Sequence, residues 1–201
     1  MNKWLSLVIA LLATCALAAT PENLLENGSF DDPKDPFKGW MVDYAWTGNE
    51  VYMQNKDRVS LVPRDGMKKT IMKITPKQGG ENKVETQLIK FDPNARYRCT
   101  MDLKANTKNK YGPTRVYFAG YRWKPGVRPH DTPCPGETRM VYKSKAETGF
   151  PGSWKKISLD FPMQKLSSAA KKHLRQVRFF SVYIWTAQGV SINNVKVYKL
   201  P

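Results

Sequence analysis

Two stretches decide the fold of this chain: Asn23-Leu24-Leu25-Glu26-Asn27-Gly28-Ser29-Phe30-Asp31, with Gly39-Trp40 soon after, and Val190-Ser191-Ile192-Asn193-Asn194-Val195-Lys196-Val197-Tyr198. Between them, short runs of β-branched and aromatic residues are separated by Gly, Pro, Asn and Asp. This pattern is typical of an all-β sandwich, in which short strands are joined by turns. The sequence shows no internal repeat, low-complexity tract or interdomain linker.

The pattern predicts ten strands, enough for two packed antiparallel sheets. Lys165 to Arg175 has apolar residues at helical spacing, so one or two helical turns are expected there. The prolines of Lys124 to Glu137 predict a long irregular loop. The predicted strands are Trp40 to Trp46, Arg58 to Val62, Thr70 to Ile74, Val84 to Phe91, Tyr97 to Lys104, Arg115 to Trp123, Arg139 to Lys143, Trp154 to Phe161, Val177 to Thr186 and Val190 to Tyr198.

The two quoted stretches resemble the opening and closing strands of carbohydrate-binding modules of the family 4/9 type, which have the galactose-binding-like β-sandwich fold. Such modules begin N-L-L-x-N-G-x-F-[DE], with G-W shortly afterwards, and end I-D-[DN]-V. The resemblance extends over nearly all of residues 19–201. It implies a two-sheet jelly roll and a function in sugar recognition rather than in chemistry.

Interior segments resemble the same modules in the same order. Asp65 to Ile74 is similar to D-G-x-x-S-G-x-x-x-L-K-I, but is shorter and lacks the Ser-Gly pair. Phe91 to Tyr97 is similar to L-x-P-G-x-x-Y, and Gly152 to Phe161 is similar to G-x-W-x-K-[VI]-x-x-x-F. The resemblance places Trp40 in the core, and Trp154, which opens a strand, is expected to pack under a loop.

Residues 1–18 read as a secretory signal peptide. Lys3 supplies the positive region, Leu5 to Ala13 the apolar segment, and Ala16-Leu17-Ala18 the small-residue cleavage site. The apolar segment is too short to span a bilayer as a helix. We therefore expect export to the periplasm, the cell surface or the medium, and a single domain over residues 19–201.

Cysteine usage leaves two alternatives open. If Cys15 is removed with the signal peptide, Cys99 and Cys134 remain. An exported protein can join such a pair in a disulfide, which would stabilise the fold by roughly 3–4 kcal/mol. The alternative is two free, buried thiols. Metal binding by these cysteines is not expected, because no C-x-x-C motif or nearby histidine cluster accompanies them.

The charge of the chain is strongly basic, with a formal net charge of +16. Two stretches contain seven basic residues each and no acid, namely residues 103–130 and residues 161–201. Such a field attracts polyanions and raises their encounter rate. An anionic polysaccharide is therefore an expected partner, and a specific nucleic acid is not. The alternative is that the charge only keeps the protein soluble.

Strand alternation groups aromatic side chains on one face of the predicted strands Arg115 to Trp123 and Val177 to Thr186, because residues two apart share a face. On Val177 to Thr186 the other face is apolar, with Phe180, Val182 and Ile184, and is expected to face the core. The aromatic face therefore needs a cover or a ligand. Tyr and Trp rings suit sugars, whose apolar C–H faces stack on them. We interpret the following residues as a candidate carbohydrate-binding site: Arg115, Tyr117, Tyr121, Trp123, Tyr183 and Trp185.

Arg115 shares this face and could form paired hydrogen bonds to a carboxylate or sulfate. The alternative is that the loop from Lys124 to Glu137 packs over the face, which would make the aromatic residues a second core. We expect Arg115 and Arg122 to be the most consequential charges for binding of an anionic polymer, and Lys165 to Arg175 to contribute less.

The resemblance also implies one structural calcium ion, held by oxygen ligands at the edge of the sandwich. Asp31 matches the acid of the opening motif. Asn193 occupies the place of the aspartate in the closing motif, so one carboxylate is replaced by a neutral amide. Asp31 and Asn193 are the expected ligands, and the alternative is a hydrogen bond that caps the two end strands.

Motifs of common enzyme classes are absent from the sequence, including G-x-S-x-G, H-E-x-x-H and the P-loop. The two histidines, His130 and His173, fall in predicted loops with no visible partner. The sequence therefore predicts an exported protein without catalytic activity that binds a polysaccharide. A structural or assembly protein of the cell surface is the first alternative, and a polysaccharide lyase that uses Arg115, Tyr117, Tyr121 and His130 is the second.

Overall fold

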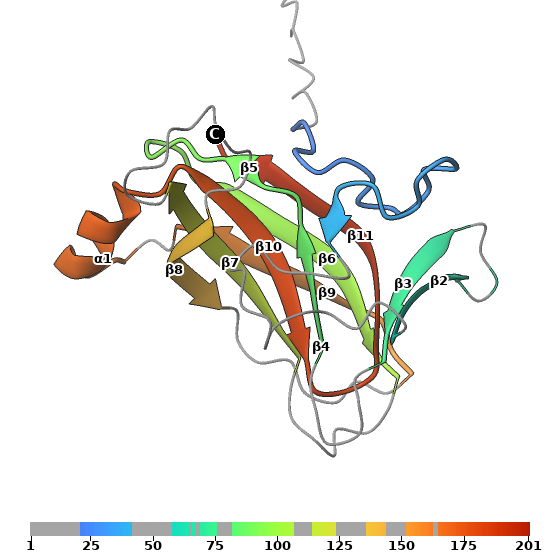
Figure 1. The fold of residues 1–201 in the computed structure, drawn as a ribbon. Coiled ribbons are helices and arrows are strands. Elements are labelled where there is room, and N and C mark those ends of the chain that lie inside the picture. The colour runs from blue at the N-terminus through green and yellow to red at the C-terminus, as the bar shows by residue number, and fades with distance from the viewer. Residues whose placement is uncertain are drawn as a thin grey trace, which may run out of the picture.

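Two antiparallel β-sheets face each other in the computed structural model (Figure 1). The model describes residues 21–41, 58–64, 66, 69–75, 82–106, 114–123, 136–143, 152–162 and 165–201, without the side chains of 41, 123 and 136–143. The six-stranded sheet has the order β1-β4-β10-β7-β8, and β5 also pairs with β10. Its strands are β1 (Trp40–Met41), β4 (Asn82–Thr86), β5 (Ile89–Lys90), β7 (Thr114–Trp123), β8 (Gly136–Lys143) and β10 (Phe179–Thr186).

The five-stranded sheet has the order β2-β3-β11-β6-β9. The single helix of the described residues, α1 (Ser168–Leu174), connects β9 to β10. Among these residues no helix is long and apolar enough to cross a membrane. The strands of this sheet are β2 (Val59–Pro63), β3 (Thr70–Ile74), β6 (Tyr97–Ala105), β9 (Lys155–Phe161) and β11 (Val190–Lys199).

The two-sheet antiparallel sandwich predicted from the sequence is confirmed, and so are the helical turns within Lys165 to Arg175. Several strand ends differ from the prediction by one to three residues, and two differences change the description of an element. The predicted strand from Val84 to Phe91 is interrupted at Gln87 and Leu88, which lie between β4 and β5. The predicted loop from Lys124 to Glu137 ends earlier, because β8 begins at Gly136. The rest of that loop and residues 1–18 lie outside the described residues.

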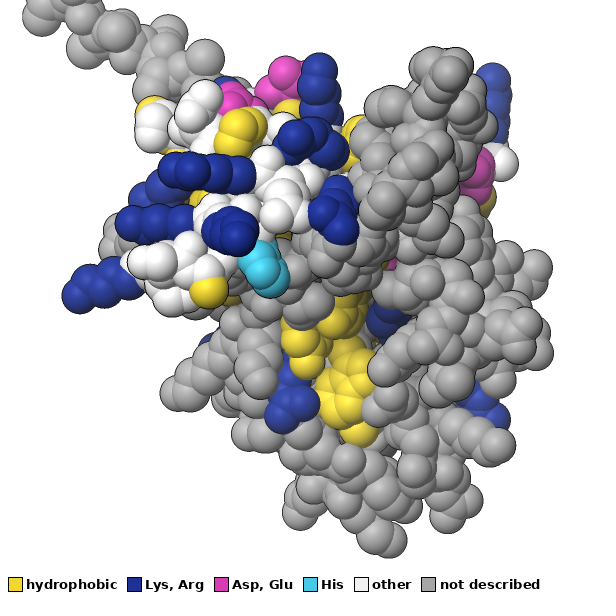
Figure 2. All heavy atoms as spheres, turned by 60° about the vertical axis from the view of Figure 1, so that its left-hand side comes forward, with side chains coloured by type: hydrophobic (Ala, Val, Ile, Leu, Met, Phe, Trp, Pro, Cys, Tyr) yellow, Lys and Arg dark blue, Asp and Glu magenta, His cyan; other side chains and the backbone are white. Residues whose placement is uncertain are grey.

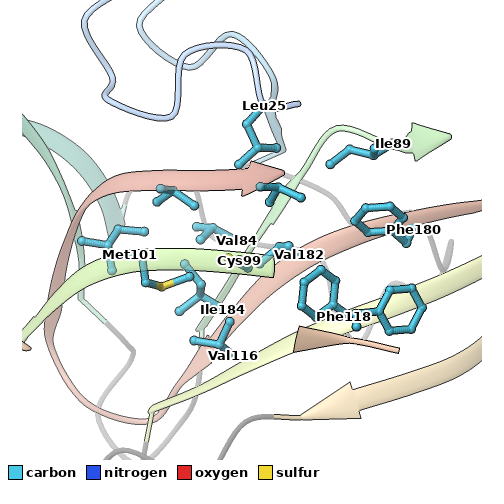
Figure 3. Packing of buried hydrophobic residues seen from close by; sticks show 14 of the residues in the cluster. Leu25, Val84, Ile89, Cys99, Met101, Val116, Phe118, Phe180, Val182 and Ile184 are labelled. Carbon is cyan, nitrogen blue, oxygen red and sulfur yellow. The ribbon is translucent and has the colours of Figure 1, made fainter. Parts of the chain in front are cut away.

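The core lies between the sheets and follows from strand alternation. Along β6 every second residue is buried, so that Tyr97, Cys99, Met101, Leu103 and Ala105 point inward. The facing strand β10 contributes Phe180, Val182 and Ile184, each 0% exposed. Figure 3 shows Cys99, Met101, Phe180, Val182 and Ile184 among the side chains that pack between the sheets. Fully burying one such apolar side chain stabilises the fold by about 1.5–3 kcal/mol.

Each sheet is organised around a strand from the end of the chain. In the six-stranded sheet β10 lies between β4 and β7, and in the five-stranded sheet β11 lies between β3 and β6. Both strands are antiparallel to their neighbours. The register of β10 and β11 therefore fixes which side chains of both sheets face the core.

The opening stretch is held against β11. The backbone N–H of Leu24 donates to the carbonyl oxygen of Val197 (2.7 Å), and the N–H of Val197 donates to Oδ1 of Asn23 (2.8 Å). The N–H of Val195 donates to the carbonyl oxygen of Gly28 (2.9 Å). A Cβ atom on Gly28 would overlap the carbonyl oxygen of Val195, so the close approach of the two segments requires glycine.

Two buried rings complete the docking of this stretch. Phe30 is 1% exposed and its ring lies 5.2 Å from that of Trp40, centroid to centroid. The indole Nε1 of Trp40 donates to the carbonyl oxygen of Asn27 (3.3 Å). Asn27 has a positive φ of 41°, and its Nδ2 donates to the carbonyl oxygen of Pro36 (2.8 Å). The predicted core position of Trp40 is confirmed.

Cys99 is a free thiol in the core, 1% exposed, and Figure 3 shows it among the apolar side chains. Burial raises its pKa to about 12, because desolvation disfavours the thiolate. Cys134 lies outside the described residues. The position of Cys99 favours the alternative of a free buried thiol, and the Cys99–Cys134 disulfide stays a prediction.

We expect Gly28→Ala to destabilise the fold by about 1–3 kcal/mol, because an added methyl group would overpack the contact with Val195. The free energy of unfolding, measured by urea denaturation, checks this. Ser29→Ala is the matched control, since the neighbouring Ser29 is exposed. Equal stabilities of the two variants would show that the opening stretch is not packed tightly on β11.

Candidate functional site

The outer side of the six-stranded sheet carries the aromatic residues that alternation places opposite the core. Tyr183 on β10 pairs with Tyr117 on β7, and Trp185 pairs with Arg115. All four side chains are half-buried, whereas the intervening Val182 and Ile184 are fully buried in the core. We call Arg115, Tyr117, Tyr183 and Trp185 the aromatic face.

Tyr117 and Tyr183 form a stacked pair, with ring centroids 4.4 Å apart and an interplanar angle of 11°. The ammonium of Lys83 lies 4.7 Å from the centroid of the Tyr183 ring. Because β10 lies between β4 and β7, Tyr183 is flanked by Lys83 from one neighbouring strand and by Tyr117 from the other. Cation–π attraction and stacking together hold this ring in place.

Trp185 has a cation beside it as well. The guanidinium carbon of Arg115 lies 5.3 Å from the centroid of the indole ring. The structure therefore brings together four of the six residues that the sequence analysis singled out. Trp123 ends β7, but its side chain lies outside the described part of the chain.

Glu85 is a residue of this site that the sequence analysis missed. It pairs with Tyr183 from β4 and is 0% exposed. Its Oε1 accepts hydrogen bonds from the hydroxyl of Tyr121 and from that of Ser181 (2.5 Å), and its Oε2 lies 3.5 Å from Nζ of Lys83. A buried carboxylate needs such partners, because desolvation of an unpaired charge is very costly.

Tyr121 is only 1% exposed, and its hydroxyl is taken by Glu85. Tyr121 is therefore a buried partner of Glu85, and a sugar would not reach its ring. The sequence could have shown on which side of its strand Glu85 lies, although not which partners it has there. Because Val84 is an apolar core residue, its neighbours Lys83 and Glu85 must both point to the outer side of the strand.

Basic side chains gather around α1, next to one end of the six-stranded sheet. Nη1 of Arg122 donates to Oε1 of Gln176 (2.5 Å), so this guanidinium lies near the end of α1 rather than on the aromatic face. Figure 2 shows Lys and Arg side chains gathered on this side of the molecule, above a hollow that contains hydrophobic side chains. The exposed basic residues are Lys165, Lys171, Lys172, Arg175 and Arg178.

Asp31 and Asn193 were predicted to hold calcium. Asp31 is exposed, and the buried Asn193 accepts a hydrogen bond at Oδ1 from the N–H of Asn194 (2.6 Å). Backbone N–H groups of Asp35 and Lys34 donate to the Asp32 carboxylate and lower its pKa. The described residues contain no group of three or more acids, histidines or cysteines that could hold a metal. Calcium binding by Asp31 and Asn193 stays a prediction.

No protein-family model matches this sequence, and no curated protein sequence matches it significantly. Solved structures share its fold. The CBM22-1 xylan-binding domain of Paenibacillus barcinonensis Xyn10C aligns with a TM-score of 0.53 and 13% identity, over 89% of this chain and 95% of that chain. The chain shares the β-sandwich fold of carbohydrate-binding modules. Membership of the family 4/9 type stays a prediction.

Two further structures are similar at the level of the fold. The CBM22-1–GH10 modules of Clostridium thermocellum endo-1,4-β-D-xylanase 10B align with a TM-score of 0.50 and 12% identity, over 82% of this chain and 27% of that chain. The enzymatically active domain of bacteriophage CBA120 tailspike protein 4 aligns with a TM-score of 0.50 and 13% identity, over 89% of this chain. This chain spans 21% of that tailspike chain.

We expect Glu85→Gln to destabilise the fold by about 3 kcal/mol, because the Lys83 ammonium would lose its buried counter-charge. Glu26→Gln is the matched control. Glu26 pairs with Lys38 at 3.4 Å, but both side chains are about half exposed (55% and 51%), so the change should cost less than about 1 kcal/mol. Urea denaturation of both variants checks the difference. Losses of similar size would show that Glu85 is not a structural charge.

Proposed function

We propose that this protein binds a polysaccharide on the aromatic face without cleaving it. The observation that supports the proposal most strongly is the group of half-exposed rings of Tyr117, Tyr183 and Trp185 on the outer side of a sheet, in a fold that carbohydrate-binding modules share. Extended sugar chains suit such a face, because each pyranose can stack its C–H side on a ring. The aromatic residues are held by the sheet, so little ordering is needed on binding.

Tyr117 and Trp185 are the rings that we assign to direct sugar contact. The ring of Tyr183 contacts Lys83 and Tyr117. It therefore holds the Tyr117 ring in place and is not assigned to sugar stacking. Arg115 lies beside Trp185 and can donate two parallel hydrogen bonds to a carboxylate or sulfate. This arrangement favours a polymer that carries uronic acids or sulfate groups over a neutral one.

A binding role without catalysis fits the chemistry of the face. Glu85 is the only acid among the residues of β4, β7 and β10. It is fully buried and accepts hydrogen bonds from Tyr121 and Ser181, so it is not placed to exchange a proton with a substrate. Hydrolysis of a glycosidic bond by the usual route needs two acids that reach the substrate. With the secretory signal predicted for residues 1–18, we propose that the protein meets its ligand outside the cytoplasm.

We expect Trp185→Ala and Tyr117→Ala each to weaken polysaccharide binding about tenfold, which corresponds to about 1.4 kcal/mol per lost stacking contact. Affinity electrophoresis through gels that contain uronic, sulfated or neutral polysaccharides measures the effect. Tyr198→Ala is the matched control, because Tyr198 is a half-buried aromatic residue on β11 in the other sheet. Retardation that both aromatic-face variants retain would place the sugar elsewhere, and no retardation of the native protein by any polymer would contradict the proposal.

Salt dependence separates an anionic from a neutral ligand. We expect binding to polygalacturonate or a sulfated polymer to weaken steeply with added salt, because pairing of charges releases counterions. Arg115→Gln should make this dependence shallower. Lys196→Gln, an equal change of charge at an exposed position on the other sheet, should leave it nearly unchanged. Isothermal titration at several salt concentrations measures the slope. A slope near zero for every ligand would show that the basic charge serves solubility alone.

A further inference from the structure

A pocket lies on the outer side of the five-stranded sheet, whereas the aromatic face lies on the six-stranded sheet. Its volume is about 410 Å³, within the range of small-molecule sites. The side chains that define its chemistry are Lys73, Lys104, Asn106 and Ser191, with Val62 and Ile71 as an apolar wall. No acid is among the described residues that line it.

The sheet register places two cations on either side of one hydroxyl group. Ser191 on the central strand β11 pairs with Lys73 on β3 and with Lys104 on β6. Neighbouring strands are about 4.8 Å apart, so the Cα atoms of the two lysines are about 10 Å apart on the same face. Two flexible ammonium groups at this spacing can close on one anion bound over Ser191.

Asn106 adds a directed donor that has no acceptor. Its backbone N–H donates to the carbonyl oxygen of Gly189 (2.8 Å), which fixes its place at the end of β6. Its Oδ1 accepts a hydrogen bond from Oγ of Ser191 (3.0 Å), and its Nδ2 is buried without a hydrogen-bond partner among the described residues. An unsatisfied buried donor costs about 1–3 kcal/mol, so a rotation of the Asn106 side chain that turns Nδ2 toward a ligand oxygen would be favourable.

Two side chains from segments next to the edge strands of this sheet meet beside the pocket. Arg64 follows β2 and Trp154 precedes β9, and these strands are the two edges of the sheet. The guanidinium carbon of Arg64 nevertheless lies 4.3 Å from the centroid of the Trp154 ring, and Nζ of Lys104 lies 5.9 Å from it. The side chains of Arg64 and Trp154 therefore meet on the outer side of the sheet. They add an aromatic ring and a third cation beside the pocket.

We propose that this pocket binds the acidic group of a sugar residue, whether carboxylate, sulfate or phosphate. Lys73 and Lys104 pair with its charge, Nδ2 of Asn106 donates to one of its oxygens, and Val62 and Ile71 contact the C–H side of the sugar ring. The site is separate from the aromatic face because it lies on the other sheet. It would thus recognise an acidic residue even if the aromatic face does not bind a polymer.

The test is a titration of the ¹⁵N-labelled full chain with four small probes: methyl β-glucuronoside, glucose 6-sulfate, glucose 6-phosphate and the neutral methyl β-glucoside. We expect saturable shifts of the amide signals of Lys104, Asn106 and Ser191 with at least one acidic probe and none with the neutral one. Comparison of the three acidic probes identifies the group. Absence of saturable shifts with all three would overturn the proposal.

Matched variants separate the pocket from general attraction. Lys73→Gln combined with Lys104→Gln should weaken binding of the best probe about tenfold or more, by loss of both charge-assisted contacts. Asn106→Asp, which keeps the shape but repels an anion, should abolish binding. Lys171→Gln combined with Lys172→Gln removes the same charge from α1 and should have little effect. Equal losses in the two double variants would overturn the proposal. Unchanged binding in the Lys73→Gln, Lys104→Gln variant would overturn it as well.

Trp185→Ala keeps this test independent of the proposed polysaccharide function. That variant should bind the acidic probe as the native protein does, because residue 185 is on β10 in the other sheet. Thermal unfolding of each variant checks that it is folded. If Trp185→Ala abolished the shifts at Asn106 and Ser191 while remaining folded, the probe would be bound through the aromatic face and the second site would be refuted.

Discussion

Burial of the Glu85 carboxylate constrains the arrangement of the whole aromatic face. A charge that is removed from water must be matched by donors and a counter-ion, since the desolvation cost amounts to several kcal/mol. Tyr121 from β7, Ser181 from β10 and Lys83 from β4 meet this need. Because they come from three neighbouring strands, the carboxylate fixes the strands' side chains relative to one another. Lys83, once held by Glu85, lies against the ring of Tyr183.

The strand β10 contributes side chains both to the core and to the aromatic face. Its inward residues, among them Val182 and Ile184, are fully buried in the core, while Tyr183 and Trp185 point outward from the same backbone. The core packing thereby holds the aromatic face rigid, as a binding platform requires. The same arrangement recurs on β11, where Ile192 points into the core and Ser191 lies between two lysines of the neighbouring strands.

Much of the fold could be predicted from the sequence because its signals are local. Alternation marked nearly all the strands, and the resemblance of the opening motif placed Trp40 in the core. The interruption at Gln87 and Leu88 was missed, because it shows only as a one-residue shift in the register of pairing with β10, where Glu85 lies opposite Tyr183 and Ile89 opposite Phe180. Tyr117, Tyr183 and Trp185 could be grouped by face. The role of Glu85 and the pocket around Ser191 could not, since both depend on pairing between strands distant in sequence.

The place of β10 and β11 has a consequence for the order of events during synthesis. These strands leave the ribosome after the other described strands, yet each lies at the centre of its sheet. Strands made earlier, such as β4 and β7 or β3 and β6, have no direct partner in one another until β10 and β11 arrive between them. Neither sheet can close on a nascent chain. Folding of this protein is therefore a late event dominated by non-local contacts.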